Sequence, residues 1–325
     1  MVLVTGFLGS GKTTLVSALL RHEELVDTAV IVNELGEVAI DHHLLRRVDE
    51  RTVLLGAGCV CCTLRGDLVD ELRDLLDRAD AGEIPRFRRV VVETTGVADP
   101  APLLGTLVTQ PFVRGHYELE RLVATVDAVN GLCGPEALRQ AAAADTIVVT
   151  KADLAPPGPV VESLRRLNPA ATVLAAAFGE VAPAALLDVG GRRRDPAAFA
   201  HAVGGDGHLH GDGVATLAVV LDDAVDWTAF GIWLTMLLRS RGGDVLRVKG
   251  LLDTGGPGPL LLNGVQHVVH PPEHLPAWPD GDRRSRIVFI GRGLDPALLE
   301  RSLRTFLRAA PAATTARRSP PRPRR

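Results

Sequence analysis

Short runs of apolar, often β-branched residues alternate with amphipathic stretches along the chain up to residue 174. Runs of this kind are typical of strands that are buried on both faces of a parallel sheet. The intervening stretches repeat their apolar residues with the spacing of helices packed on such a sheet. The expected strands are 2–5, 28–33, 52–55, 89–93, 122–127, 146–150 and 171–174, and the expected helices include 68–76, 101–109, 135–143 and 160–167. This alternation predicts an α/β fold: a mainly parallel sheet with helices on both faces.

The alternation stops at residues 190–213, where glycine, arginine and histidine replace the apolar runs, as in a linker. A smaller set of elements follows, and its pattern predicts a C-terminal α+β domain. Its expected strands are 215–221, 245–252, 259–262, 265–269 and 286–290, and its expected helices are 228–239 and 296–307. The last residues are rich in proline and arginine, so we expect a disordered basic tail. The expected division is 1–189, the linker 190–213, 214–308 and the tail 309–325.

The first expected strand leads into residues 6–13, which read GFLGSGKT and match the P-loop pattern in full. Glycines in this pattern let backbone N–H groups curl around phosphate oxygens at the start of the next helix. Lys12 would reach the β- and γ-phosphates, and Thr13 would offer its hydroxyl to Mg²⁺. A plain glycine-rich turn is the alternative, but the order strand, loop, helix disfavours it. We expect a sheet of the P-loop NTPase type that binds a triphosphate through Gly9, Ser10, Gly11, Lys12, Thr13 and Thr14.

Lysine is rare in this chain, since its 36 basic side chains include only Lys12, Lys151 and Lys249. A guanidinium is too wide and planar for a phosphate nest, which explains a lysine at position 12. Lys151 lies in the segment 150–153, TKAD, at the end of an expected strand. The carboxylate of Asp153 can accept the N1–H and 2-amino hydrogens of guanine, a pair that adenine lacks, and the stem of Lys151 can lie over the base. This segment favours GTP, with a simple strand cap as the alternative.

Acidic residues and a glycine after two other strands predict Mg²⁺ ligands and a γ-phosphate sensor. The strand 89–93 ends in Glu93, which can hold Mg²⁺ directly or through water. Three residues later, the N–H of Gly96 can meet the γ-phosphate. Glu37 and Asp41, in the segment 33–41 after the second strand, can face Mg²⁺ or a second metal; a solvated acidic loop is the alternative.

Three of the four cysteines, Cys59, Cys61 and Cys62, fall within four residues, which is no disulfide framework. They follow the strand 52–55 and an expected turn at 56–58, so they lie at the carboxyl edge of the sheet, where phosphates bind. Soft thiolates select Zn²⁺, Co²⁺ or Cu⁺ over Mg²⁺, and this tight spacing favours an open site over a structural one. Small buried side chains or a redox pair are the alternatives. His208 and His210 in the linker are weaker metal candidates, and solvation is the more common role of such histidines.

Composition excludes several classes of partner. The net charge of −3 gives no bias toward nucleic acid, and no apolar run approaches the roughly 18 residues that span a bilayer. The chain begins directly with an expected strand, without the layout of a signal peptide. The basic tail contains no aromatic residue, which favours solvation over binding of nucleic acid. We expect a cytoplasmic protein without membrane or specific nucleic-acid partners.

Taken in order, these motifs resemble those of the CobW-type metallochaperone GTPases, relatives of HypB and UreG. The matching segments are 6–14, 33–41, 58–62, 93–100 and 151–153, and segments 246–251, 264–266 and 286–291 are similar to the C-terminal domain of that family. The resemblance implies GTP hydrolysis, with Mg²⁺, coupled to delivery of Zn²⁺ or Co²⁺ to a client metalloprotein. It leaves the client, the metal and a nucleotide-dependent dimer open.

Two departures from the family pattern change the expectations. Thr150 stands where the guanine motif usually has asparagine, which predicts weaker support of the loop but keeps Asp153. The histidine-rich stretch of some members is reduced to His201, His208 and His210, which disfavours metal storage there. Two other functions stay open: a P-loop kinase for a small molecule, although no arginine-bearing lid is evident, and a non-catalytic regulator that binds nucleotide and zinc.

Overall fold

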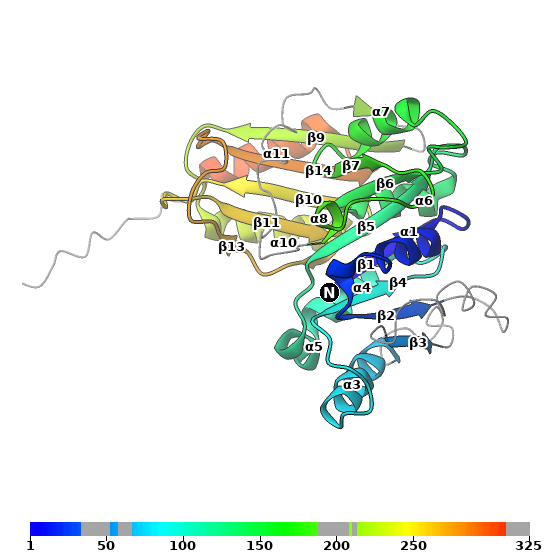
Figure 1. Ribbon diagram of the computed structural model, residues 1–325. Coiled ribbons are helices and arrows are strands. Elements are labelled where there is room, and N and C mark those ends of the chain that lie inside the picture. Colours follow the sequence, from blue (N-terminus) through cyan, green and yellow to red (C-terminus); the bar gives the residue numbers. More distant parts are fainter. Residues whose placement is uncertain (34–52, 58–66, 188–207, 210–212, 310–325) are drawn as a thin grey trace, which may run out of the picture.

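The computed structural model describes residues 1–33, 53–57, 67–187, 208–209 and 213–309. Seven strands of the first half form one sheet in the order β3-β2-β4-β1-β5-β6-β7, and every neighbouring pair is parallel (Figure 1). The strands are β1 Val2–Gly6, β2 Thr28–Asn33, β3 Val53–Ala57, β4 Arg89–Glu93, β5 Arg121–Asp127, β6 Thr146–Thr150 and β7 Thr172–Ala175. The predicted parallel sheet is confirmed, with the P-loop strand β1 between β4 and β5.

Helices cover both faces of this sheet, because the strands carry apolar side chains on both faces and these side chains need partners. They are α1 Lys12–Leu19, α3 Asp67–Asp80, α4 Pro100–Thr109, α5 Pro111–His116, α6 Gly134–Ala143, α7 Gly158–Leu167 and α8 Pro183–Leu186, with a 3₁₀ turn at Glu23–Leu25. Val2 and Val4 pack with α1 and α8 on one face, whereas Leu3 packs with α3 and α4 on the other. Helices α6 and α7 continue the second layer over β5 and β6.

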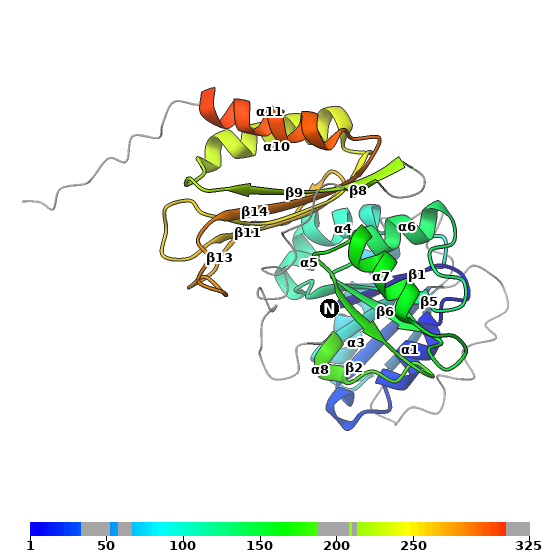
Figure 2. The ribbon, with the colours of Figure 1, turned by 90° about the horizontal axis from the view of Figure 1, so that it is seen from above.

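The second half forms an antiparallel sheet in the order β12-β11-β10-β14-β9-β8, with β13 paired to β11. Its elements are β8 His208–Leu209, β9 Val214–Leu221, α10 Trp227–Arg241, β10 Val245–Leu252, β11 Leu260–Val265, β12 Val268–Val269, β13 Glu273–His274, β14 Ser285–Arg292 and α11 Pro296–Ala309. Helices α10 and α11 cover its outer face (Figure 2). The predicted C-terminal α+β fold is therefore present.

The inner face of the antiparallel sheet packs on helices of the first half, so that α4 and α6 lie between the two sheets (Figure 2). One apolar cluster spans the junction and includes Ala141 and Leu167 of the helices together with Leu246 and Ile290 of the strands. Burial of these side chains joins the two halves through a common core.

Polar groups at the same junction are paired across it. Arg247, only 1% exposed, donates to the carboxylate of Asp145 and to the carbonyl of Ala143. Lys249 donates from Nζ to the carbonyl of Ala170 at 3.3 Å, and its Nζ lies 3.9 Å from Asp145 Oδ1. Pairing of this kind offsets the cost of burying the two cations. The third lysine of the chain therefore lies at the domain junction.

Some boundaries differ from the predicted ones. The expected turn at 56–58 is partly strand, because β3 stays paired with β2 as far as Ala57. The expected break between the strands 259–262 and 265–269 is also wrong: Asn263 and Gly264 remain in β11, paired with β10, and the turn comes at Gln266. Residues 208–209, expected in the linker, form β8 against β9. No described helix is both long and apolar enough to cross a membrane.

Candidate functional site

The P-loop is shaped by close contacts with the neighbouring strand β5. A Cβ on Gly6 would lie 2.1 Å from Thr125 Oγ1, so only glycine fits there. Ser10 Oγ and Thr125 Oγ1 are 2.6 Å apart, which holds the loop against the strand. The loop then turns into α1 through Gly11, whose φ of +88° favours glycine. The first turn of α1 contains no acidic residue, and its N-cap offers no side chain, so its N–H groups suit an anion.

Lys12 is folded onto the P-loop itself. Its side chain is mostly buried, and Nζ donates to the carbonyls of Gly6 at 3.0 Å and Phe7 at 3.3 Å. The ammonium therefore lies inside the loop that would surround the phosphates. Of the other P-loop candidates, Ser10 is buried, Gly9 has a φ of +70° with open space around it, and Thr14 is exposed.

Thr13 and Glu93 meet at the ends of two neighbouring elements. Glu93 ends β4, which pairs with β1, and Thr13 lies in the first turn of α1. Thr13 Oγ1 donates to Glu93 Oε1 at 2.7 Å, and Glu93 is 2% exposed. A hydroxyl beside a carboxylate is an oxygen donor set of the kind that Mg²⁺ takes beside phosphates. These two residues fit a magnesium ion.

Gly96 lies directly against the P-loop. A Cβ there would come within 2.6 Å of the backbone nitrogen of Leu8, so glycine is required for this approach. The loop that contains it starts at Thr94, whose N–H donates to the carbonyl of Val4 at 2.9 Å. The structure thus places the loop around Gly96 against Leu8 of the P-loop.

Gln140 of α6 supports the loop around Gly96, a role that the sequence analysis did not predict. The residue is 1% exposed, and its Nε2 donates to the carbonyls of Gly96 at 3.2 Å and Ala98 at 3.0 Å. A signal was present, because a glutamine falls among the buried alanines of that helix. A polar side chain on a buried helix face needs a partner, and here it finds two.

The predicted guanine motif follows β6 at the same edge of the sheet. Lys151 has a φ of +56°, and its Nζ lies 3.2 Å from Asp127 Oδ2 at the end of β5. Burial raises the pKa of Asp127, but hydrogen bonds from Asn130 and Lys151 outweigh it and hold that pKa below its usual value. Asp127 is thus a carboxylate at neutral pH, and it keeps Lys151 at the carboxyl edge of the sheet.

Thr150 supports the P-loop directly. Its hydroxyl donates to the carbonyl of Ser10 at 2.6 Å, although the pair is 140 residues apart. Thr150 is 3% exposed, and a Cβ on Gly11 would touch its side chain. Threonine at this position thus supports the P-loop through one hydroxyl, which joins β6 to the loop.

A further loop lies beside Asp153. The N–H of Phe178 donates to Asp153 Oδ1 at 3.4 Å, and the N–H of Ala152 donates to the carbonyl of Ala176 at 3.1 Å. A Cβ on Gly179 would lie 2.8 Å from the carbonyl oxygen of Thr14, so this loop also contacts α1. Phe178 is 70% exposed and has a φ of +53°. Sequence reasoning missed these residues, since no motif marks them.

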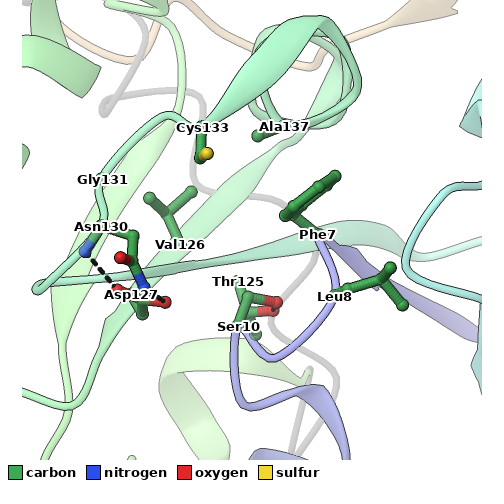
Figure 3. A pocket seen from close by; sticks show the side chains of 10 residues that line it. All are labelled: Phe7, Leu8, Ser10, Thr125, Val126, Asp127, Asn130, Gly131, Cys133 and Ala137. Carbon is green, nitrogen blue, oxygen red and sulfur yellow. Dashed lines mark hydrogen bonds between the residues drawn. The ribbon is translucent and has the colours of Figure 1, made fainter.

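A small cavity of about 80 Å³ separates the P-loop from the start of α6 (Figure 3). In Figure 3, Asp127 lies against Asn130 on one side, while Phe7 and Leu8 line the other. The ten lining residues include Cys133 but no arginine. The residues that line this cavity therefore offer no guanidinium group.

The acidic and cysteine candidates lie outside the part of the chain that the structure describes. Glu37, Asp41, Cys59, Cys61, Cys62 and His210 lie outside the described residues, and of His208 only the backbone is described, in β8. Within the described ranges, no three Cys, His, Asp or Glu side chains gather at metal-binding distance. The structure does give the ends of β2 and β3, Asn33 and Ala57, from which the acidic and cysteine segments begin.

Comparison with known proteins adds a family context. The nucleotide-binding-domain model of the CobW/HypB/UreG family matches residues 1–175, and the model for the C-terminal domain of the cobalamin synthesis protein CobW matches residues 214–307. The zinc chaperone YjiA of Escherichia coli (strain K12) is 34% identical over 302 residues, covering 90% of this chain and 93% of its own.

Another relative and a solved structure also match this chain along most of its length. The zinc chaperone CobW of a Sinorhizobium species is 29% identical, covering 89% of this chain and 91% of its own. The crystal structure of the Zn(II)-bound YjiA GTPase from E. coli matches with a TM-score of 0.70 at 29% identity. That match covers 94% of this chain and 98% of the other, so it includes both sheets.

Proposed function

The chain belongs to the CobW/HypB/UreG family, and we propose that it is a GTP-hydrolysing metallochaperone that binds zinc or cobalt and passes the ion to a client metalloprotein. The observation that carries the proposal is the 2.7 Å contact between Thr13 and Glu93. It puts a hydroxyl and a buried carboxylate beside the loop in which the phosphates of a nucleotide bind. The family and its P-loop geometry together support hydrolysis of a triphosphate.

The hydrolytic roles follow from positions along the carboxyl edge of the sheet. Lys12 would exchange the carbonyls of Gly6 and Phe7 for phosphate oxygens, with the N–H groups of α1 facing the same anion. Thr13 and Glu93 would hold Mg²⁺, which supplies positive charge to the phosphates. The N–H of Gly96 would donate to a γ-phosphate oxygen while water attacks phosphorus, leaving GDP and inorganic phosphate.

Base selection is proposed for the guanine motif. Asp153 would accept the two guanine hydrogens in place of the N–H of Phe178, which it accepts at 3.4 Å. Lys151 would lie over the base while remaining near Asp127. The hydroxyl of Thr150 ties this motif to the P-loop, so base and phosphate sites are held at a fixed distance.

Zinc is proposed as the cargo, because two relatives that match along most of this chain are named zinc chaperones. The proposed ligands are Cys59, Cys61 and Cys62, with Glu37 and Asp41 as further candidates. Support comes from the parallel sheet: β2 and β3, which precede these segments, end at the same edge as β1. Thiolates suit Zn²⁺ and Co²⁺ alike, so cobalt is kept as the second ion.

Coupling between the two sites is proposed as the basis of delivery. If a triphosphate orders the loop after Glu93 and the neighbouring metal segments, the metal binds more tightly with GTP than with GDP. Linkage then requires that the metal tighten GTP by the same factor, typically about 5- to 150-fold. Hydrolysis would lower the metal affinity and release the ion to the client.

A metal titration with a competing chelator tests this function. We expect tighter Zn²⁺ binding with a slowly hydrolysed GTP analogue than with GDP, and a thiolate-to-Co²⁺ charge-transfer band that disappears in Cys61→Ala. Lys12→Ala should abolish GTP turnover and make metal affinity independent of nucleotide. Lys249→Met, which removes a lysine at the domain junction, is the matched control and should keep turnover. Equal metal affinity in both nucleotide states would remove the delivery mechanism, and phosphoryl transfer to a small molecule would indicate a kinase.

A further inference from the structure

Asp99 ends the loop that begins after Glu93, and it also caps the next helix. Its Oδ1 accepts the N–H of Ala101 at 3.0 Å at the start of α4. A cap of this kind fixes where the loop stops and the helix begins. The position of Asp99 therefore sets one end of the segment that contains Gly96.

A second partner of Asp99 comes from the other sheet. Gln266 lies in the turn between β11 and β12, and its Nε2 donates to both carboxylate oxygens of Asp99, at 3.2 and 3.0 Å. The two residues are 167 positions apart. Arg139 of α6 adds a longer contact of 3.7 Å from Nε. The carboxylate is thus held between its own helix, α6 and the C-terminal domain.

The backbone of Gln266 is in a conformation that favours glycine. Its φ is +50°, one of three such values for non-glycine residues in the described chain. Strained backbone positions of this kind tend to mark functional contacts. A glycine there would relieve the strain but would remove the amide that contacts Asp99.

Apolar packing fixes α4 on the same turn. Val265, just before Gln266, belongs to one buried cluster with Ala101 and Leu104 of α4. Gly105, the next residue of α4 after Leu104, lies close to β12: a Cβ on it would be 3.2 Å from the side chain of Val268. This close packing means that α4, and with it the end of the loop, cannot move far unless the β11–β12 turn moves too.

We propose that Gln266 is a positioning residue for the γ-phosphate loop, through which the C-terminal domain sets the preference of the site for a triphosphate over a diphosphate. This inference rests on the proposed GTPase function. The loop must hold Gly96 against the P-loop to donate to a γ-phosphate, whereas GDP makes no such contact. Fixing Asp99 lowers the cost of ordering the loop, so it favours GTP alone. By linkage, a bound triphosphate strengthens the contact between the turn and Asp99.

Gln266→Met tests the proposal by removing both donor hydrogens at similar side-chain length. We expect the ratio of the dissociation constants for GDP and a slowly hydrolysed GTP analogue to fall about fivefold, the lower end of typical coupling. Thr216→Val is the matched control, because Thr216 Oγ1 donates to the carbonyl of Leu167 at 2.7 Å, which is another side-chain hydrogen bond across the junction. The control should lower the melting temperature similarly and leave the ratio unchanged.

Reversing the polarity of the contact separates positioning from general loss of stability. Gln266→Glu places a carboxylate against Asp99 and should lower the ratio at least as far as Gln266→Met. Adding Asp99→Asn supplies an amide that donates to the new carboxylate and remains a good helix cap, so the double variant should recover most of the ratio.

The outcomes distinguish this inference from the function on which it rests. A wild-type protein that binds the GTP analogue, with the wild-type ratio retained in both Gln266 variants, overturns the positioning role and leaves the GTPase. A ratio that falls equally in Thr216→Val also overturns it. A wild-type protein that does not bind the GTP analogue overturns both.

Discussion

Single hydroxyl groups connect the P-loop to its neighbours in this chain. Thr150 donates to the carbonyl of Ser10, and Thr125 meets the hydroxyl of Ser10. Beside the loop, Thr94 donates to the hydroxyl of Thr5 in β1 at 3.0 Å. These contacts are made within the protein itself, and they hold the phosphate cradle against β5 and β6. A loop held in this way has less conformational freedom to lose when a ligand binds.

Thr150→Val tests the value of one such hydroxyl. Valine keeps the shape, but the buried carbonyl of Ser10 loses its donor, at a cost of about 1 kcal/mol. We expect GTP and GDP to bind about fivefold more weakly, by isothermal titration calorimetry, because both occupy the P-loop. Thr150→Asn, which brings an amide donor, should restore most of the affinity. A loss confined to GTP would contradict this role.

Motif residues could be found from the sequence because their chemistry requires neighbours along the chain. Lys12 must follow its glycines, and Asp153 must follow the end of its strand. Gln140, Gln266 and Phe178 could not be found in the same way, since each reaches the edge of the site from a different element. Only tertiary packing brings them there.

At the scale of the element, α6 takes part in two separate contacts, one near its middle and one at its C-terminus. Near its middle, Gln140 donates to the loop around Gly96. At its C-terminus, the amide of Asn168 donates to the carbonyls of Ala141, Ala142 and Ala144 at 2.9–3.0 Å. The second contact satisfies carbonyl groups that every helix end leaves without a partner in the helix.

Gln140→Leu separates these two roles. We expect the kcat of GTP hydrolysis to fall about tenfold, about 1.4 kcal/mol in activation free energy, while GDP affinity stays unchanged, because only the γ-phosphate loop loses its donors. Asn168→Leu should lower the free energy of unfolding and leave kcat unchanged. Steady-state kinetics and urea unfolding of both variants check this, and an equal fall of kcat in both would argue against a specific role of Gln140.

Long elements were predictable because their own apolar pattern determines them, and all seven strands of the parallel sheet were found. The short elements β8, β13, α5 and α8 were not predicted, because a few residues carry no periodicity, and β12 was predicted only as part of a longer strand, 265–269. The turn after β11 was misplaced for a physical reason. Asn263 and Gly264 are typical turn residues, but pairing of β11 with β10 keeps them in the strand.

At the scale of the whole molecule, a buried ion pair between Arg247 and Asp145 joins the two halves of the protein. Arg247 is 1% exposed, and its principal anionic partner is Asp145. Asp145 also accepts the N–H of Leu122 at 3.0 Å, so it links β5 to the C-terminal domain. Removing one member of a buried pair leaves the other charged group in a poorly solvated place.

Asp145→Ala should therefore destabilise the protein by about 3–5 kcal/mol. Because the two halves share an apolar cluster, we expect one unfolding transition rather than two, followed by circular dichroism and tryptophan fluorescence in urea. Glu162→Ala is the control, since Glu162 and its partner Arg166 are both exposed, and it should change the midpoint little. Two separate transitions in the wild type would show that the halves unfold independently.

The existence of two folded parts could be predicted from the composition change after residue 189, but their packing could not. The sequence pattern places Ala141 and Leu246 on apolar faces of their elements, but it does not show which apolar faces pack together. The same holds for Asp145 and Arg247, which are 102 positions apart. Contacts at such separation follow from topology, which the pattern of single elements leaves open.

The shared core has a consequence for synthesis on the ribosome. Helix α6 is complete at Ala143, but its outer face is covered only when β10 and β14, ending at Arg292, have been made. At translation rates of roughly 5–20 residues per second, the nascent chain carries that apolar face uncovered for about 7–30 seconds. During that interval the incomplete protein exposes an apolar surface that is buried in the complete protein. We expect chaperones that bind nascent chains to bind this surface.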